Sequence, residues 1–70
     1  RNPREAEIRT ALVDGPATPE TLTTLIYKDV APVIQKMATR NVLAHLVDLT
    51  QRGVVAPIGP LSSSAKFTLN

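Results

Sequence analysis

The feature that most constrains the fold is a change of periodicity at Gly53. Before it, residues 33–52 contain no glycine or proline, and their apolar side chains recur with helical spacing. After it comes the β-branched pair Val54-Val55, which favours an extended strand. Glycine commonly ends a helix because it adopts the left-handed backbone conformation without steric cost. The sequence therefore predicts a long helix that passes directly into a strand.

The long helix is expected to be amphipathic. Successive helical residues are separated by about 100°, which gathers one set of apolar side chains into a single arc. The arc consists of Val42, Leu43, Leu46, Val47 and Leu49. The opposite face consists of Arg40, Asn41, Ala44, Asp48, Gln51 and Arg52, with His45 at the border. The tract is expected either as one helix or as two segments that meet at a bend near residues 37–39.

Two shorter helices are predicted upstream. Each begins with a capping residue and a proline followed by an acid, first at Asn2-Pro3-Arg4-Glu5 and then at Thr18-Pro19-Glu20. The sequence Asp14-Gly15-Pro16 ends the first helix, and Ala31-Pro32 marks the start of the third. The predicted helices span about 3–14, 18–27 and 32–52. Their expected inward side chains include Ile8, Leu12, Leu22, Leu25 and Ile26.

Two strands are expected after Gly53, over about 54–58 and 66–69, joined by a loop that contains Ser62, Ser63 and Ser64. A lone hairpin is marginal in water, so Phe67, Leu69 and the valines must pack on the helices. Three helices followed by a hairpin predict a mainly α (α+β) fold, a winged helix-turn-helix with a three-helix core and a C-terminal β-hairpin wing. Residues 1–70 are expected to form a single domain. Because the first residue is Arg1, we expect it to be a piece of a longer chain.

Size and composition limit the chemistry. A 70-residue chain has little surface to spare for a deep active-site cleft, so an enzyme complete in itself is not expected. The absence of cysteine excludes disulfides and thiolate metal sites, and it fits an intracellular, reducing compartment. One histidine and scattered carboxylates offer no metal-ligand spacing, so no cofactor is expected in this domain. No segment is suited to spanning a membrane.

The charges favour a weak interaction with an anionic partner. Residues 1–30 hold four cations against five carboxylates, a balance of −1, whereas residues 31–70 hold four cations against Asp48, a balance of +3. Arg40 and Asn41 on the long helix suit bases or phosphates, and Lys66 is the one cation of the wing. So few cations predict weak, salt-sensitive nucleic-acid binding, and a solvated polar face explains them equally well.

Several segments resemble the metallo-β-lactamase-associated winged helix, the small domain that follows the catalytic domain in β-lactamase-like metallohydrolases. They are "REAEI" (4–8), "GPATPETL" (15–22), "YKDV" (27–30) and above all "ATRNVLAHLVDLTQRGVV" (38–55). The resemblance implies an accessory domain that shapes the substrate cleft of a zinc-dependent hydrolase, with zinc held by the preceding catalytic domain. The family that the chain resembles includes ribonucleases that act on single-stranded RNA and thioesterase-like hydrolases. Thr21 stands where an acid is common in the family, and for residues 56–69 we identify no resemblance.

The resemblance assigns Arg40, Asn41 and His45 as cleft-facing, and we add Lys66 as a further residue that faces substrate or nucleic acid. The expected partners are the β-lactamase-fold catalytic domain and an anionic substrate such as single-stranded RNA, and a homodimer is a further option. Two other functions stay open at this stage. One is a DNA-binding winged helix of a transcription regulator, and the other is an interaction or dimerisation module.

Overall fold

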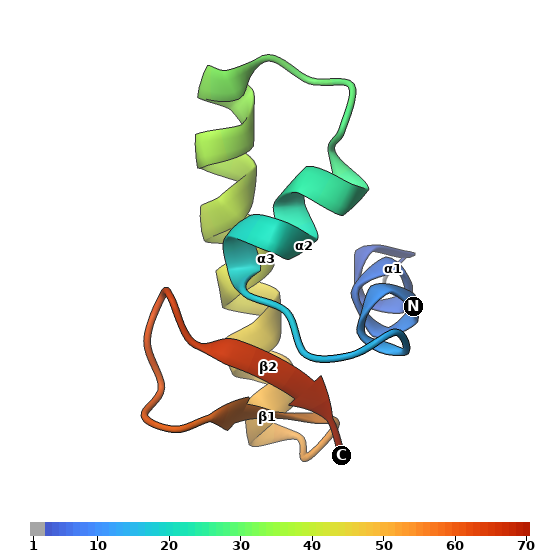
Figure 1. Cartoon of the computed structure of the whole chain (residues 1–70), viewed down its shortest axis with the longest axis vertical. Coiled ribbons are helices and arrows are strands. Elements are labelled where there is room, and N and C mark those ends of the chain that lie inside the picture. The colour runs from blue at the N-terminus through green and yellow to red at the C-terminus, as the bar shows by residue number, and fades with distance from the viewer. Residues whose placement is uncertain (1–2) are drawn as a thin grey trace.

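The computed structural model describes residues 3–70, so the predicted cap at Asn2 lies outside the described residues. The elements follow in the order α1 (Pro3–Leu12), α2 (Pro19–Ile26), α3 (Pro32–Gln51), β1 (Val55–Ile58) and β2 (Lys66–Leu69). Figure 1 shows α2 lying between α1 and α3, with the hairpin at the base of the molecule. This arrangement confirms the predicted three-helix core with a β-hairpin wing.

The helix α1 ends two residues earlier than predicted. The Val13 amide donates to the Thr10 carbonyl at 3.2 Å, so the last turn tightens, and Gly15 closes the turn onto Leu12 at 3.1 Å. Ile8 and Leu12 are buried as expected, whereas Val13 is 71% exposed because it lies beyond the helix.

The helix α2 begins as predicted. The Thr18 hydroxyl accepts a hydrogen bond from the Thr21 amide at 3.1 Å, and Pro19 occupies the first turn. Its inward face differs from the predicted stripe, because Pro19, Leu22 and Thr23 are buried while Leu25 is 56% exposed. Thr23 can take an inward position because its hydroxyl donates to the Pro19 carbonyl at 2.7 Å.

The helix α3 is one continuous element, so the alternative of two segments is wrong. Nothing interrupts its hydrogen bonding between residues 37 and 39: Ala38 packs inward and the Thr39 hydroxyl donates to the Gln35 carbonyl at 2.8 Å. Val42, Leu46 and Leu49 are fully buried, whereas Leu43 and Val47 are half-buried at the edge of the arc. Twenty residues make this helix about 30 Å long, close to the 31 Å length of the molecule.

Gly53 joins the helix to the hairpin with a φ of 77°, the left-handed region expected from the sequence. The Val54 amide donates to the Leu49 carbonyl at 2.9 Å, so Val54 completes the helix end and β1 starts one residue later than predicted. The strands are antiparallel, with Val55 opposite Leu69 and Ile58 opposite Lys66.

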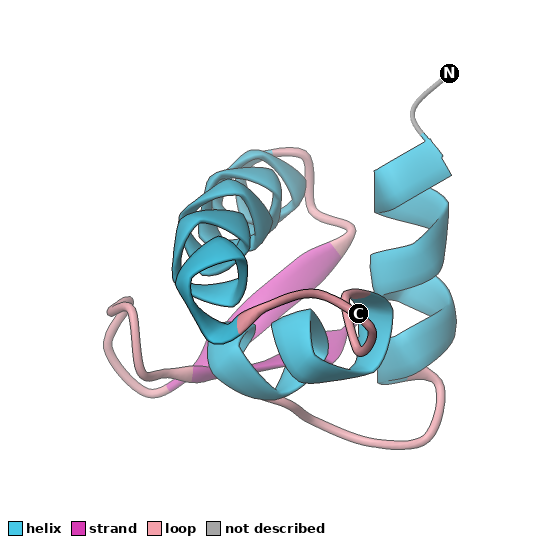
Figure 2. Ribbon diagram, turned by 90° about the horizontal axis from the view of Figure 1, so that it is seen from above, coloured by secondary structure: helices cyan, strands magenta, loops and turns pink. Residues whose placement is uncertain are grey.

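The core lies where the helices meet the hairpin. Figure 2, seen from above, shows α1 and α3 on opposite sides of the molecule with the strands beneath them. Phe67 of β2 is fully buried among side chains from all three helices, and Tyr27 packs half-buried at its edge. The core consists of Ile8, Leu12, Ala17, Leu22, Val42, Leu46, Leu49, Val55, Ala65 and Phe67.

Candidate functional site

The outer face of α3 is the surface that the sequence analysis singled out. Ala38, Val42 and Leu49 of α3 are buried and define the side of the helix that faces the core. At 100° per residue, Arg40 projects from the opposite side, and it is exposed. Asn41 is also exposed and lies about 100° further round the helix, so the two residues do not share one direction.

Lys36 lies one turn before Arg40 and extends the same surface. Both side chains are exposed. In the part of the chain that the structure describes, neither Lys36 nor Arg40 has an ion pair or a side-chain hydrogen bond. Residues four apart on a helix are neighbours, so two positive charges that form no ion pair lie side by side. The sequence analysis did not assign Lys36 to the site, although its spacing from Arg40 is the signal that identifies it.

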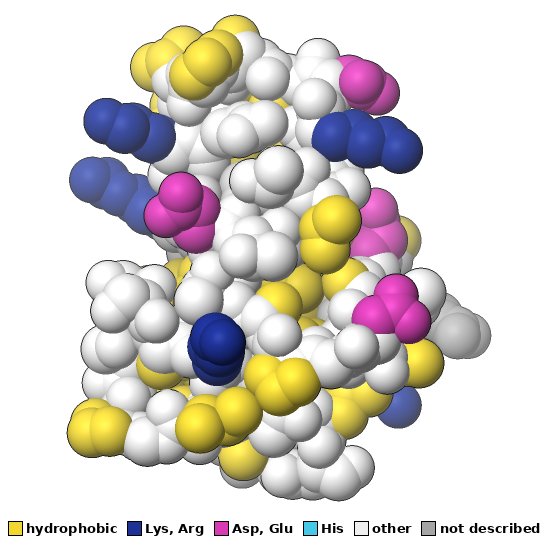
Figure 3. Space-filling view, viewed as in Figure 1, with side chains coloured by type: hydrophobic (Ala, Val, Ile, Leu, Met, Phe, Trp, Pro, Cys, Tyr) yellow, Lys and Arg dark blue, Asp and Glu magenta, His cyan; other side chains and the backbone are white. Residues whose placement is uncertain are grey.

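Figure 3 shows the surroundings of this surface. On the side formed by α3, Lys and Arg side chains project from the edge of the molecule, with one carboxylate side chain close by. Above them, a group of hydrophobic side chains covers the end of the molecule where α3 begins. The outer face of α3 therefore combines an apolar end with a basic middle.

His45 lies on a different side of α3 from Arg40. It is one turn after Asn41 and seven residues before Arg52, so these three residues run along one side of the helix. Arg52, at the end of that side, reaches Glu5 of α1. His45 is half-buried, in keeping with a border position, whereas Asn41 is exposed.

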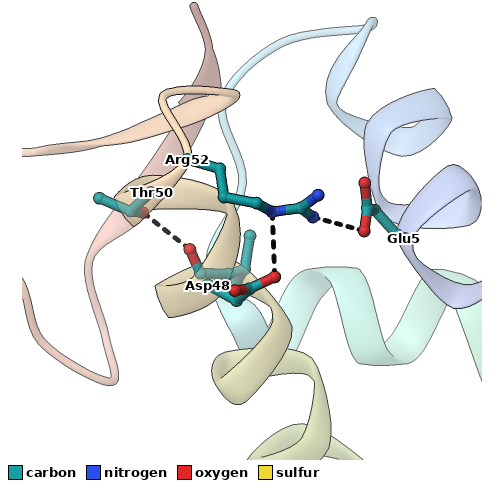
Figure 4. A network of polar contacts seen from close by, with 5 residues as sticks. Glu5, Asp48, Thr50 and Arg52 are labelled. Atoms are coloured by element: carbon teal, nitrogen blue, oxygen red, sulfur yellow. Dashed lines mark hydrogen bonds and ion pairs between the residues drawn. The ribbon is translucent and has the colours of Figure 1, made fainter. Parts of the chain in front are cut away.

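Arg52 connects the end of α3 to α1. Its Nη2 donates to Glu5 Oε2 at 2.5 Å, and its Nε lies 3.1 Å from Asp48 Oδ2, as Figure 4 shows. The hydrogen bond that the Arg52 guanidinium donates to Glu5 raises the pKa of Arg52, partial burial lowers it, and the charges of Asp48 and Glu5 raise it further. Asp48 is thus paired within the domain, so its charge on the outer surface of α3 is partly neutralised. This pairing was not predicted from the sequence.

Lys66 lies on the wing, at the first position of β2 and opposite Ile58. Its side chain is exposed and, within residues 3–70, makes no ion pair or hydrogen bond. The structure therefore places Lys66 on a separate element from Arg40, Asn41 and His45. The three serines of the wing loop are also exposed, and the hydroxyls of Ser62 and Ser64 lie 3.4 Å apart.

Comparison with known families matches residues 18–60 to the beta-lactamase associated winged helix domain. The match covers α2, α3 and β1, which are the elements that carry Lys36, Arg40, Asn41 and His45. The chain belongs to this family. Comparisons with curated proteins and with solved structures gave no match.

The winged helix domain is thereby associated with a β-lactamase-fold partner domain. The family match starts at Thr18 and ends at Pro60, so it leaves out α1 and β2. Among residues 3–70 the domain has no group of three or more His, Cys, Asp or Glu side chains that could hold a metal ion. Within the same residues, none of its helices has the length and apolar character that a membrane crossing requires.

Proposed function

We propose that this winged helix is the accessory domain of a zinc-dependent hydrolase with the metallo-β-lactamase fold, and that it helps to bind an anionic substrate. The family match supports the first part, because the family is defined by its association with β-lactamase. Zinc would be held by the catalytic domain, because the described part of this chain offers no ligand cluster for it. The domain contributes no catalytic group.

The second part is carried by one observation, the pair of cations on the outer face of α3, Lys36 and Arg40, which form no ion pair within the described residues. A guanidinium such as that of Arg40 binds carboxylates and phosphates through two parallel hydrogen bonds. Lys36, one turn away, adds a second positive charge to the same surface. Asn41 flanks Arg40 and can donate and accept hydrogen bonds to the polar groups of a substrate. Single-stranded RNA is one substrate with the required charge.

The alternative of a DNA-binding transcription regulator is less well supported. The family match is to β-lactamase-associated domains. In addition, a winged helix that binds DNA places its third helix in the major groove and needs cations for the phosphates on either side. Residues 55–69, which form the wing, contain one cation, Lys66.

The test uses the natural full-length protein that contains this chain. We expect its sequence to carry His-x-His-x-Asp-His upstream of Arg1, and the purified protein to contain zinc and to hydrolyse its substrate. Arg40→Ala is expected to weaken substrate affinity about tenfold, because charge-assisted hydrogen bonds contribute roughly 1.5–3 kcal/mol. Its zinc content should be unchanged.

Arg9→Ala is the matched control, because Arg9 is exposed on α1 and makes no ion pair within the described residues. It should bind substrate as the unmodified protein does. A natural protein without the zinc motif would contradict the proposal, and so would an Arg40→Ala variant with unchanged affinity.

A further inference from the structure

The first two turns of α3 carry three exposed apolar side chains that lie outside the core cluster of the described residues. Val33 is 67% exposed, Ile34 48% and Met37 65%. Met37 lies three residues after Ile34 and four residues after Val33, so it neighbours both on the helix surface. Single exposed apolar residues are normal on protein surfaces, whereas a contiguous group indicates an interaction site. We call these three residues the apolar tip.

The apolar tip is held in a fixed position. Gln35, within the same two turns, points inward, and its Nε2 donates to the Tyr27 carbonyl at 3.1 Å. The next inward residue is Ala38, which is 5% exposed. The tip is therefore the projecting end of a helix that is anchored on its other side, and its side chains are presented by regular secondary structure. A partner would need to order little backbone in order to bind it.

We infer that the apolar tip is the surface on which the β-lactamase-fold catalytic domain docks. This inference rests on the function proposed above. The segment shared with the family spans residues 18–60, so the surface responsible for the association is expected within it. Five large apolar side chains in that segment are exposed, and three of them form the tip; the others, Leu25 and Ile58, lie on α2 and β1.

The size of the tip favours a tethered domain over a second copy of this chain. A stable interface between separate proteins buries about 800 Å² on each partner, contributed by roughly 20–30 residues. Three side chains supply a small part of that area. An interface between domains of one chain can be smaller, about 600 Å² in total, because the covalent connection supplies a high effective concentration.

The charges beside the tip agree with this assignment and link it to the substrate surface. Lys36 lies between Ile34 and Met37 in sequence and has no ion pair within the described residues. Lys36 therefore stays available to an anionic substrate at the border of the interface. Arg40 lies one turn beyond Lys36 and three residues beyond Met37, on the same outer surface. Docking at the tip would place Arg40 at the edge of the interface, facing the substrate cleft.

The experiment introduces negative charge at the tip in the natural full-length protein. Val33→Asp combined with Met37→Glu should separate the domains, seen as a larger radius of gyration in small-angle scattering. The KM should rise about tenfold, the expected effect of losing a central interface contact. Val33 lies at the second position of α3, where a negative side chain interacts favourably with the positive end of the helix dipole. The domain should therefore stay folded. Circular dichroism checks this.

Val13→Asp is the matched control, because Val13 is the same residue type with a similar exposure of 71% and lies outside the family segment. It should leave the radius of gyration and the KM unchanged. Equal behaviour of the tip variant and this control would overturn the inference. So would a concentration-dependent dimer of the full-length protein that the tip variant converts to monomer, since the occupant would then be a second copy.

The same measurements separate this inference from the proposed function. If the tip variant keeps the original radius of gyration while Arg40→Ala still weakens substrate affinity, the docking surface is wrong and the proposed function stands. If neither variant changes affinity, both are wrong.

Discussion

Ala17 and Phe67 exchange two backbone hydrogen bonds across the centre of the domain. The Phe67 amide donates to the Ala17 carbonyl at 2.8 Å, and the Ala17 amide donates to the Phe67 carbonyl at 3.1 Å. This bridge adds the connection between α1 and α2 to the edge of the hairpin. It also holds the ring of Phe67 in the middle of the core, where it is fully buried. The wing is therefore part of the folded core as well as a surface element.

Phe67→Ala should destabilise the chain more than any other single truncation in the wing. Removing a fully buried phenylalanine costs about 3–5 kcal/mol, which is comparable with the whole stability of a domain this small. Chemical denaturation followed by circular dichroism should show the variant largely unfolded before denaturant is added. Phe67→Leu keeps most of the apolar volume and should cost roughly 1.5 kcal/mol or less. Equal stability of the two variants would show that the ring does not fill the core.

Gly53→Ala should lower the free energy of unfolding by about 1–2 kcal/mol, because φ is 77° and a β-carbon is strained in that conformation. Space is not the limit, since a β-carbon at Gly53 would meet no atom within 4 Å. Gly53→Asn separates the two causes, because asparagine tolerates the left-handed region better than alanine does. Thermal unfolding should rank the variants in the order glycine, asparagine, alanine. An alanine variant as stable as the original would contradict the helix-to-strand junction described above.

The Arg52–Glu5 ion pair should make a small contribution to the free energy of unfolding. This contribution should depend on salt and should not change with pH through the neutral range. The stabilisation is fully present below the pKa that Arg52 has in the unfolded chain. It is lost only as the pH rises through the pKa that Arg52 has in the folded protein. The hydrogen bond that Arg52 donates to Glu5 raises the folded pKa, so the guanidinium stays charged at any ordinary pH. A double-mutant cycle with Arg52→Ala and Glu5→Gln, followed by thermal unfolding, measures the coupling. The coupling should weaken as sodium chloride is added, and a coupling that is unaffected by salt would argue against the pair.

The order of elements could be predicted because each one is specified locally. Thr18 with Pro19 starts α2, and Gly53 ends the run of helical spacing and leads into Val55. The buried stripe of α3 followed from periodicity alone. These signals depend on neighbours in sequence, so no tertiary contact was needed to interpret them.

The tertiary pairings could not be predicted. Glu5 and Arg52 are 47 residues apart, and Ala17 and Phe67 meet only once the chain has folded. For the same reason the prediction that Leu25 points inward was wrong, because the inward face of α2 depends on the angle at which α2 packs on α3. Of the candidate site, the outward position of Arg40 followed from helical geometry, and the place of Lys66 on the wing followed from the strand pattern of residues 66–69.

The salt dependence of KM in the natural full-length protein tests the central claim most directly, because the claim is that charges on α3 bind an anionic substrate. We predict that KM of the unmodified protein rises with sodium chloride concentration, as expected where Lys36 and Arg40 attract substrate. In the Lys36→Ala, Arg40→Ala double variant the KM should be higher at low salt and nearly constant as salt is added. If the double variant shows the same salt dependence as the unmodified protein, the outer face of α3 does not contact the substrate.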